Sequence, residues 1–280
     1  MVQAHFVTNY GFLGAFSNVR PLVISAMGSD VLIHPFKNKL YYRLVVYALQ
    51  NADFIICDGV NSILTIRSFG IPKEKIALIY PGIDMQLFHP LEQRNIVGKN
   101  VFYSRGFNKI YDVDTLFLAM EIIHERCPDA KFTLLGVGTE FNRFRDMVIQ
   151  AGMSEFVTYL NHISNKDLPQ YLAVSDVSIT TSLSDGGIPV STIESMACGV
   201  PVVSTNSGDA ALWIKNGESG YIVEKKNPVL LAQRVVELLN DNEKRLQFGK
   251  RARQIVEKPQ DYNLEMKKIE DLYLKLINNH

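Results

Sequence analysis

The chain has 280 residues, of which 47% are hydrophobic and 21% are charged, so it is long enough for two globular lobes and too apolar for a disordered chain. Lysine plus arginine and aspartate plus glutamate both number 29, and this zero net charge argues against bulk binding of nucleic acid. No run approaches the roughly 18 consecutive apolar residues of a transmembrane helix. The cysteines, Cys57, Cys127 and Cys198, lie far apart in apolar runs, and we expect buried, reduced thiols in a cytosolic protein.

Short apolar runs alternate with amphipathic segments along the chain, a pattern typical of βα units on a parallel sheet. In the first part we expect strands at 21–28, 53–59 and 75–82 and helices at 37–52 and 62–70. Residues 84–100 are polar without clear periodicity, and we interpret them as a crossing between two lobes.

Beyond the crossing the βα rhythm restarts. Strands are expected at 101–105, 131–136, 157–161, 176–182, 200–205 and 220–224. Helices are expected at 113–127, 140–152, 166–175, 191–198, 228–241 and 264–277. The second lobe therefore reads as a complete doubly wound α/β domain. The first reads as about half of one, whose missing part would precede residue 1.

The loop SDGGIP, residues 184–189, joins a buried strand to a short helix that contains Glu194. Gly186 and Gly187 would let the backbone approach a ligand closely, and the positive end of the helix favours phosphate. A carboxylate early in that helix can accept hydrogen bonds from the two hydroxyls of a ribose. The alternative is a tight strand-to-helix turn with an acid that merely suits the helix, and from these residues alone the two interpretations are about even.

Two further loops follow strands of the second lobe. In SRGFNKIYD (104–112), Arg105 and Lys109 could clamp a diphosphate, although a single lysine is more often a solvated surface charge. In LLGVGTEF (134–141) the third glycine of a dinucleotide fingerprint is replaced by Phe141, which weakens an oxidoreductase interpretation.

Other chemistries find little support. No GxxxxGK[ST] motif occurs, and the histidines have no metal-ligand spacing. Asp112-Val113-Asp114 could be a metal-binding DxD, but Asp114 is better explained as the cap of the following helix.

The stretch IESMACGVPVVST, after its glycine-containing loop, resembles the donor-site signature of GT-B glycosyltransferases of the family 4 type (glycosyl transferases group 1). That signature is a Glu-x7-Glu motif ending in Glu-Ala-Met-Ala-Cys-Gly-x-Pro-Val-Val. Other family-like elements follow in order: IYPGIDMQLFHP, SRGFNKIYDVDTL, LLGVGTEF, YLNHIS and SDVSITTSLSDG. The resemblance implies a GT-B fold with two Rossmann-like lobes, the first of them truncated.

The resemblance also implies lobe boundaries and residue roles. It suggests a partial acceptor-side lobe at 1–88, a nucleotide-sugar lobe at 89–262 and a final helix, 263–280, that crosses back to the first lobe. By position, Glu194 would bind the donor ribose, and Arg105 with Lys109 would balance the diphosphate charge. The remaining implied contacts are the backbone of Gly186, Gly187, Ile188 and Val190 with diphosphate and sugar, and Gly138 and Ile163 near the base.

Three departures from the family pattern stand out. Asp185 replaces the first motif glutamate and lies nine positions before Glu194 rather than eight. Met27 stands where the family often has a catalytic-site histidine, while Gly28-Ser29-Asp30 matches the pattern, so that Ser29 or Asp30 could contact acceptor or sugar. By the same resemblance, the first half of the first lobe would be missing.

These features favour a retaining glycosyltransferase that moves a sugar from a UDP- or GDP-linked donor to a glycan or lipid-linked acceptor in surface polysaccharide synthesis. No cofactor or metal is expected, because cationic side chains and a helix dipole can stabilise the leaving diphosphate. The alternative is a donor-binding module or one half of a split enzyme, and epimerisation or phosphorolysis at the same site is a third option. We also expect a cytoplasmic location, peripheral membrane contact, and a partner chain or self-association through the incomplete lobe.

Overall fold

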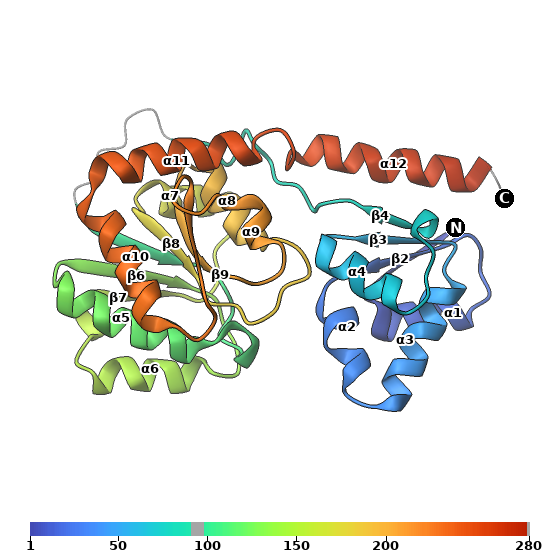
Figure 1. Ribbon diagram of the computed structural model, residues 1–280, viewed down its shortest axis with the longest axis horizontal. Helices are drawn as coiled ribbons and strands as arrows, with labels where there is room; N and C mark the ends of the chain where they lie inside the picture. The colour runs from blue at the N-terminus through green and yellow to red at the C-terminus, as the bar shows by residue number, and fades with distance from the viewer. Residues whose placement is uncertain (91–97, 279–280) are drawn as a thin grey trace. The chain divides into compact units, whose positions relative to one another are not determined.

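The computed structural model describes residues 1–90 and 98–278, which form two compact units (Figure 1). Unit 1 comprises residues 1–82, 184–188 and the chain from Tyr262 onward, and unit 2 comprises residues 83–183 and 189–261. Residues 91–97 of the expected crossing lie outside the described residues. No helix in the described part of the chain is both long and apolar enough to cross a membrane.

Unit 1 is built on a four-stranded parallel sheet in the order β1-β2-β3-β4. Every residue of β2 is buried because both faces of the sheet are covered, which matches the continuous apolar run in the sequence. The strands are β1 Val2–His5, β2 Leu22–Ala26, β3 Phe54–Cys57 and β4 Ile76–Leu78. The expected strands at 21–28, 53–59 and 75–82 are confirmed, and β1 is an addition at the edge of the sheet.

The helices of unit 1 cover both faces of its sheet. Helix α12 packs Ile269, Leu272 and Leu276 against Val23 and Ile56 of the strands. The core on the opposite face contains residues of α2, α3 and α4. The helices are α1 Phe12–Phe16, α2 Ser29–Leu32, α3 Lys39–Asn51, α4 Val60–Ser68 and α12 Tyr262–Asn278.

Unit 2 is built on a six-stranded parallel sheet in the order β10-β9-β8-β5-β6-β7. Its strands are β5 Lys99–Tyr103, β6 Ala130–Leu135, β7 Val157–Leu160, β8 Val177–Thr180, β9 Val202–Thr205 and β10 Gly220–Val223. All six correspond to expected strands. The chain runs outward from β5 to β7, returns to place β8 on the other side of β5, and continues outward to β10, as in a doubly wound domain.

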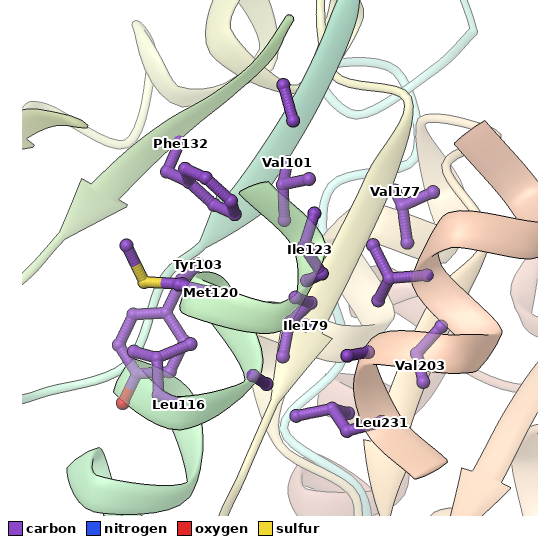
Figure 2. Close-up of a cluster of buried hydrophobic side chains, with 14 of the residues drawn as sticks. Val101, Tyr103, Leu116, Met120, Ile123, Phe132, Val177, Ile179, Val203 and Leu231 are labelled. Carbon is purple, nitrogen blue, oxygen red and sulfur yellow. The ribbon is translucent and has the colours of Figure 1, made fainter. Parts of the chain in front are cut away.

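Helices cover both faces of this sheet. Helix α5 packs against α10 over a core that includes Val101, Ile123, Ile179 and Leu231 (Figure 2), and α8 packs against α11. The helices are α5 Val113–Arg126, α6 Phe141–Gln150, α7 Leu168–Ala173, α8 Val190–Ala197, α9 Ala210–Trp213, α10 Pro228–Asn240 and α11 Asn242–Val256.

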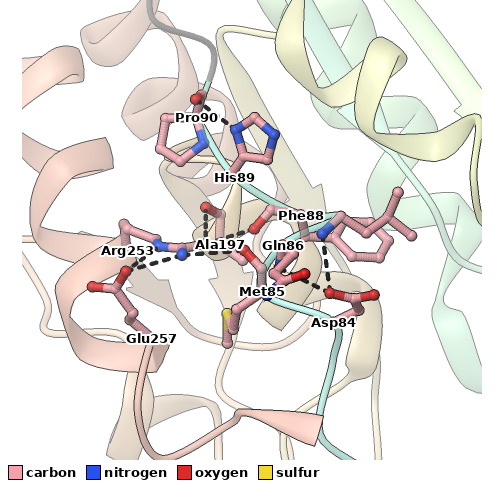
Figure 3. Close-up of polar contacts among 10 residues, drawn as sticks. Asp84, Met85, Gln86, Phe88, His89, Pro90, Ala197, Arg253 and Glu257 are labelled. Atoms are coloured by element: carbon pink, nitrogen blue, oxygen red, sulfur yellow. Dashed lines mark hydrogen bonds and ion pairs between the residues drawn. The ribbon is translucent and has the colours of Figure 1, made fainter.

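Helix α11 was not predicted from the sequence, because most of its residues are charged or polar and its apolar stripe is sparse. Two arginines, one buried and one half-buried, hold it in place instead. Arg245 Nε lies 3.0 Å from Asp176 Oδ1, and both side chains are almost fully buried. Arg253 donates to the carbonyl oxygens of Phe88 and Ala197, which ties α11 to the chain before β5 and to the end of α8 (Figure 3).

Candidate functional site

The winding of the unit 2 sheet reverses between β5 and β8, which lie side by side with Val101 opposite Val177 and Tyr103 opposite Ile179. In open α/β sheets, ligands bind beyond the carboxyl ends of the strands at such a switch point. The loops that leave β5 and β8 here are the ones that contain Arg105 and the SDGGIP sequence. The strand order and the sequence motifs therefore indicate the same region as the candidate ligand site.

Arg105 is the first of the predicted cations and is half-buried in the loop after β5. Its guanidinium carbon lies 4.4 Å from the centre of the Tyr111 ring, a distance typical of a cation–π contact. Lys109, the second predicted cation, is exposed at the start of a single 3-10 turn, Lys109–Tyr111. Arg105 thus contacts an aromatic ring, whereas Lys109 lies on the surface.

The loops at this end of the sheet are joined by hydrogen bonds. Thr181 Oγ1 donates to the Tyr111 carbonyl at 2.6 Å, and Leu183 N donates to the Ile110 carbonyl at 2.8 Å. The loop after β6 joins them, because Phe107 N donates to the Val137 carbonyl at 3.0 Å. Three loops that are distant in the sequence therefore form one connected surface.

Gly138, which we expected near the base, has a steric reason to be glycine. A Cβ at this position would lie 2.2 Å from the Phe107 carbonyl oxygen. Ile163, the other residue expected near the base, is half-buried after β7. The role of either residue in base binding stays a prediction.

Glu194 is the fifth residue of α8 and only 8% exposed. Burial raises the pKa of its carboxyl group to about 7, well above the ordinary value of 4.5. Val190, at the start of the same helix, is 38% exposed. The candidate ribose ligand is therefore a buried acid whose protonation changes near neutral pH.

Two hydroxyl groups near this helix were not singled out from the sequence. Ser182 and Thr192 are both fully buried, and neither side-chain oxygen has a hydrogen-bond partner among the described residues. Buried hydroxyls are normally paired with protein or water, so unpaired ones are places where a polar ligand or a water molecule can bind. Serine and threonine are too common in loops for their type alone to have identified them.

Residues 184–188 belong to unit 1, and close backbone packing within this unit explains why the segment contains Gly186 and Gly187. A Cβ on Gly187 would lie 2.0 Å from the Asp58 carbonyl oxygen, and a Cβ on Gly186 would lie 2.8 Å from Gly28 Cα. Gly186 and Gly187 therefore pack directly against the backbone at Gly28 and Asp58. Close packing gives the paired glycines a structural reason that does not involve phosphate, and their contact with a ligand stays a prediction.

The neighbours of these glycines are placed as follows. Asp185 is half-buried, and Ile188 is only 5% exposed. The proposed contact of either residue with donor sugar or diphosphate stays a prediction.

On the acceptor side, Asp30 is fully buried at the start of α2. Its carboxylate accepts hydrogen bonds from Val7 N at 2.6 Å and Met27 N at 3.0 Å, while burial raises its pKa more than these bonds lower it. Asp30 therefore joins the backbone that follows β1 to the backbone that follows β2. The neighbouring Ser29 is half-buried, and an acceptor contact at this turn stays a prediction.

Asp112-Val113-Asp114 has a structural role, although the capping residue differs from the expected one. Asp112 precedes α5 in the left-handed conformation, with φ 47°, and accepts a hydrogen bond from Thr115 Oγ1. Asp114 lies inside α5 and forms an ion pair with Arg143 at 2.6 Å. Among the described residues, no group of three or more His, Cys, Asp or Glu side chains could hold a metal ion.

Comparison with protein families matches residues 92–255 to the model described as "Glycosyl transferases group 1" and residues 1–59 to "Glycosyl transferase 4-like". Spore coat protein SA of Bacillus subtilis is 27% identical over 223 residues, which are 72% of this chain and 59% of that protein. Uncharacterized glycosyltransferase MJ1178 of Methanocaldococcus jannaschii is 25% identical over 92% of this chain and 70% of that protein. The N-acetyl-alpha-D-glucosaminyl L-malate synthase of Bacillus anthracis is 25% identical over 83% of this chain and 60% of that protein. The chain thus spans 59–70% of the length of these relatives.

Solved structures share the fold over nearly the whole chain. Sucrose-phosphate synthase from Thermosynechococcus elongatus superposes with a TM-score of 0.86 at 20% identity, covering 99% of this chain and 74% of that one. HepE of Anabaena, solved in complex with UDP, superposes with a TM-score of 0.83 at 20% identity, covering 98% of this chain and 79% of that one. At this identity the likeness concerns the fold.

Proposed function

The chain belongs to the glycosyl transferases group 1 family and has the GT-B fold, and on this basis we propose that it is a retaining glycosyltransferase that uses a nucleoside-diphosphate sugar. The acceptor in this proposal is a glycan or a lipid-linked sugar of a surface polysaccharide. The observation that carries the proposal is the placement of Arg105 and the buried Glu194 in or just after the loops that flank the switch point of the unit 2 sheet.

Each residue has a defined part in this chemistry. Arg105 offers N–H donors and a permanent positive charge to the donor diphosphate, and charge stabilisation of the leaving diphosphate lowers the barrier to transfer. Glu194, once ionised, accepts hydrogen bonds from the ribose hydroxyls. Lys109 supplements the positive charge, Asp185 contacts the sugar, and no metal ion is required. HepE, which shares the fold, was solved with UDP, and this supports a nucleotide as part of the donor.

A cytoplasmic location with peripheral membrane contact is part of the same proposal. Cys57, Cys127 and Cys198 are all buried, and none of them forms a disulfide bond among the described residues, which suits a reducing compartment.

Thermal unfolding in the presence of UDP-glucose or GDP-mannose tests donor binding. A donor at a hundred times its Kd should raise Tm by about 5–10 °C, and Glu194→Ala should abolish this shift. The control is Ser195→Ala in the same helix, whose hydroxyl faces the sheet and bonds to Ser178 at 3.0 Å. It should keep the donor shift. If neither nucleotide sugar changes Tm, donor binding at this site is wrong.

A donor-binding module completed by another chain is a second candidate function. The observation that favours it is a group of exposed apolar side chains close to the edge strand β1, with Tyr10 64%, Leu13 66% and Phe16 57% exposed. Donor hydrolysis or transfer by this chain alone, measured by release of UDP or GDP, would support the enzyme. Donor binding without turnover would support the module.

A further inference from the structure

We propose that Tyr111 is a positioning residue that holds the Arg105 guanidinium ready for the donor diphosphate. This inference rests on the proposed function and adds one residue to it. Tyr111 lies outside the donor-site signature IESMACGVPVVST, and its contact with the Arg105 guanidinium follows from the folded loop.

The Tyr111 ring has little freedom to move. One neighbour is the Arg105 guanidinium carbon at 4.4 Å from the ring centre, and Arg105 Nε is itself buried. The other is the backbone at Gly106, where a Cβ would lie only 3.2 Å from Tyr111 Cε2. The ring is therefore packed between the loop backbone and the guanidinium.

The backbone of Tyr111 is anchored to the sheet. Its carbonyl accepts the 2.6 Å hydrogen bond from Thr181, a fully buried residue directly after β8. Its N–H donates to the Asn108 carbonyl at 2.8 Å, which closes the 3-10 turn. Because the ring is attached to the end of a central strand, it can fix the arginine more firmly than a free loop could.

An aromatic partner suits an arginine that must bind phosphate. The face of a tyrosine ring attracts the cation through the ring quadrupole, and this contact itself uses none of the in-plane N–H donors of the guanidinium. A guanidinium ordered before binding also loses less side-chain entropy when the ligand arrives. Lys109, the other candidate cation, is exposed.

Calorimetric titration with UDP and GDP tests the inference. For the nucleotide that the wild-type chain binds, Tyr111→Leu should weaken affinity about 3- to 10-fold, the range of a partly desolvated cation–π contact. Tyr111→Phe, which keeps the ring, should stay within about twofold of the wild type. In an Arg105→Gln background, Tyr111→Leu should have no further effect, because a residue that acts only through Arg105 loses its effect with it.

Phe156→Leu is the matched control. It removes a ring that lies 4.5 Å from Lys131 Nζ, next to the amino ends of β6 and β7, and should leave nucleotide affinity unchanged. Full affinity in Tyr111→Leu, or the same loss in the Arg105→Gln background, overturns the inference while the proposed function stands. Failure of the wild-type chain to bind UDP or GDP overturns both.

Discussion

Glu194 should make the stability of unit 2 depend on pH in the direction opposite to that of a salt-bridged acid. Its pKa is about 7 in the folded chain, against 4.5 as the ordinary value. At a pH between these two pKa values, the folded state binds more protons than the unfolded state. Stability is therefore highest below about pH 4.5, falls as the pH rises toward 7, and is level above that.

The size of the effect follows from the same two values. The difference between about 7 and 4.5, at roughly 1.36 kcal/mol per pH unit, is about 3 kcal/mol. Glutamine at this position has nearly the same shape and does not titrate. Relative to the wild type, Glu194→Gln should therefore gain about 3 kcal/mol of unfolding free energy between about pH 4.5 and pH 8.

Urea unfolding of both chains, followed across this pH range, measures the effect, and the difference between the two curves removes the contribution of every other group. Glu237→Gln is the control of opposite sign. Burial alone would raise the pKa of Glu237, but hydrogen bonds from Lys244, Tyr221 and Arg234 outweigh it and lower the pKa to about 2. This variant should lose stability, relative to the wild type, as the pH rises from about 2. A flat difference between the wild type and Glu194→Gln would refute the reasoning, because the Glu194 carboxylate would then be as well solvated in the folded chain as in the unfolded one.

Two further substitutions test how the unit 2 site is supported. Arg245→Met should cost about 3–5 kcal/mol in urea unfolding, because it leaves Asp176 buried without its ion-pair partner at 3.0 Å, and a loss below about 1 kcal/mol would contradict this account. Gly138→Ala should lower the free energy of unfolding by about 1–3 kcal/mol and weaken nucleotide binding in titration calorimetry, because the new Cβ would lie 2.2 Å from the Phe107 carbonyl oxygen and must displace it. Unchanged nucleotide affinity would show that the loop containing Arg105 adjusts freely.

Tertiary contacts give several residues a role that differs from the one their residue type and position had suggested. Asp30 looked like an acceptor ligand by its place in the motif, yet its carboxylate binds two backbone N–H groups. Gly186 and Gly187 looked like a phosphate loop, and they also pack against the backbone at Gly28 and Gly59. Val7, one of the two partners of Asp30, and the glycines that meet Gly186 and Gly187 lie far away in the sequence, so that no local pattern could reveal these contacts.

The sequence by itself determined the βα order, nearly all of the strands and the family, because hydrophobic periodicity and the IESMACGVPVVST motif are local properties of the chain. Helix α11 escaped prediction because polar contacts of Arg245 and Arg253, more than an apolar stripe, attach it to the rest of unit 2. Only the tertiary structure decided that β5 lies beside β8, that the Tyr111 ring meets Arg105, and that Glu194 is buried enough to titrate near neutral pH. The order of the strands in the sheet brings together loops that the sequence separates by dozens of residues, while the Tyr111–Arg105 contact depends on how one loop folds back on itself.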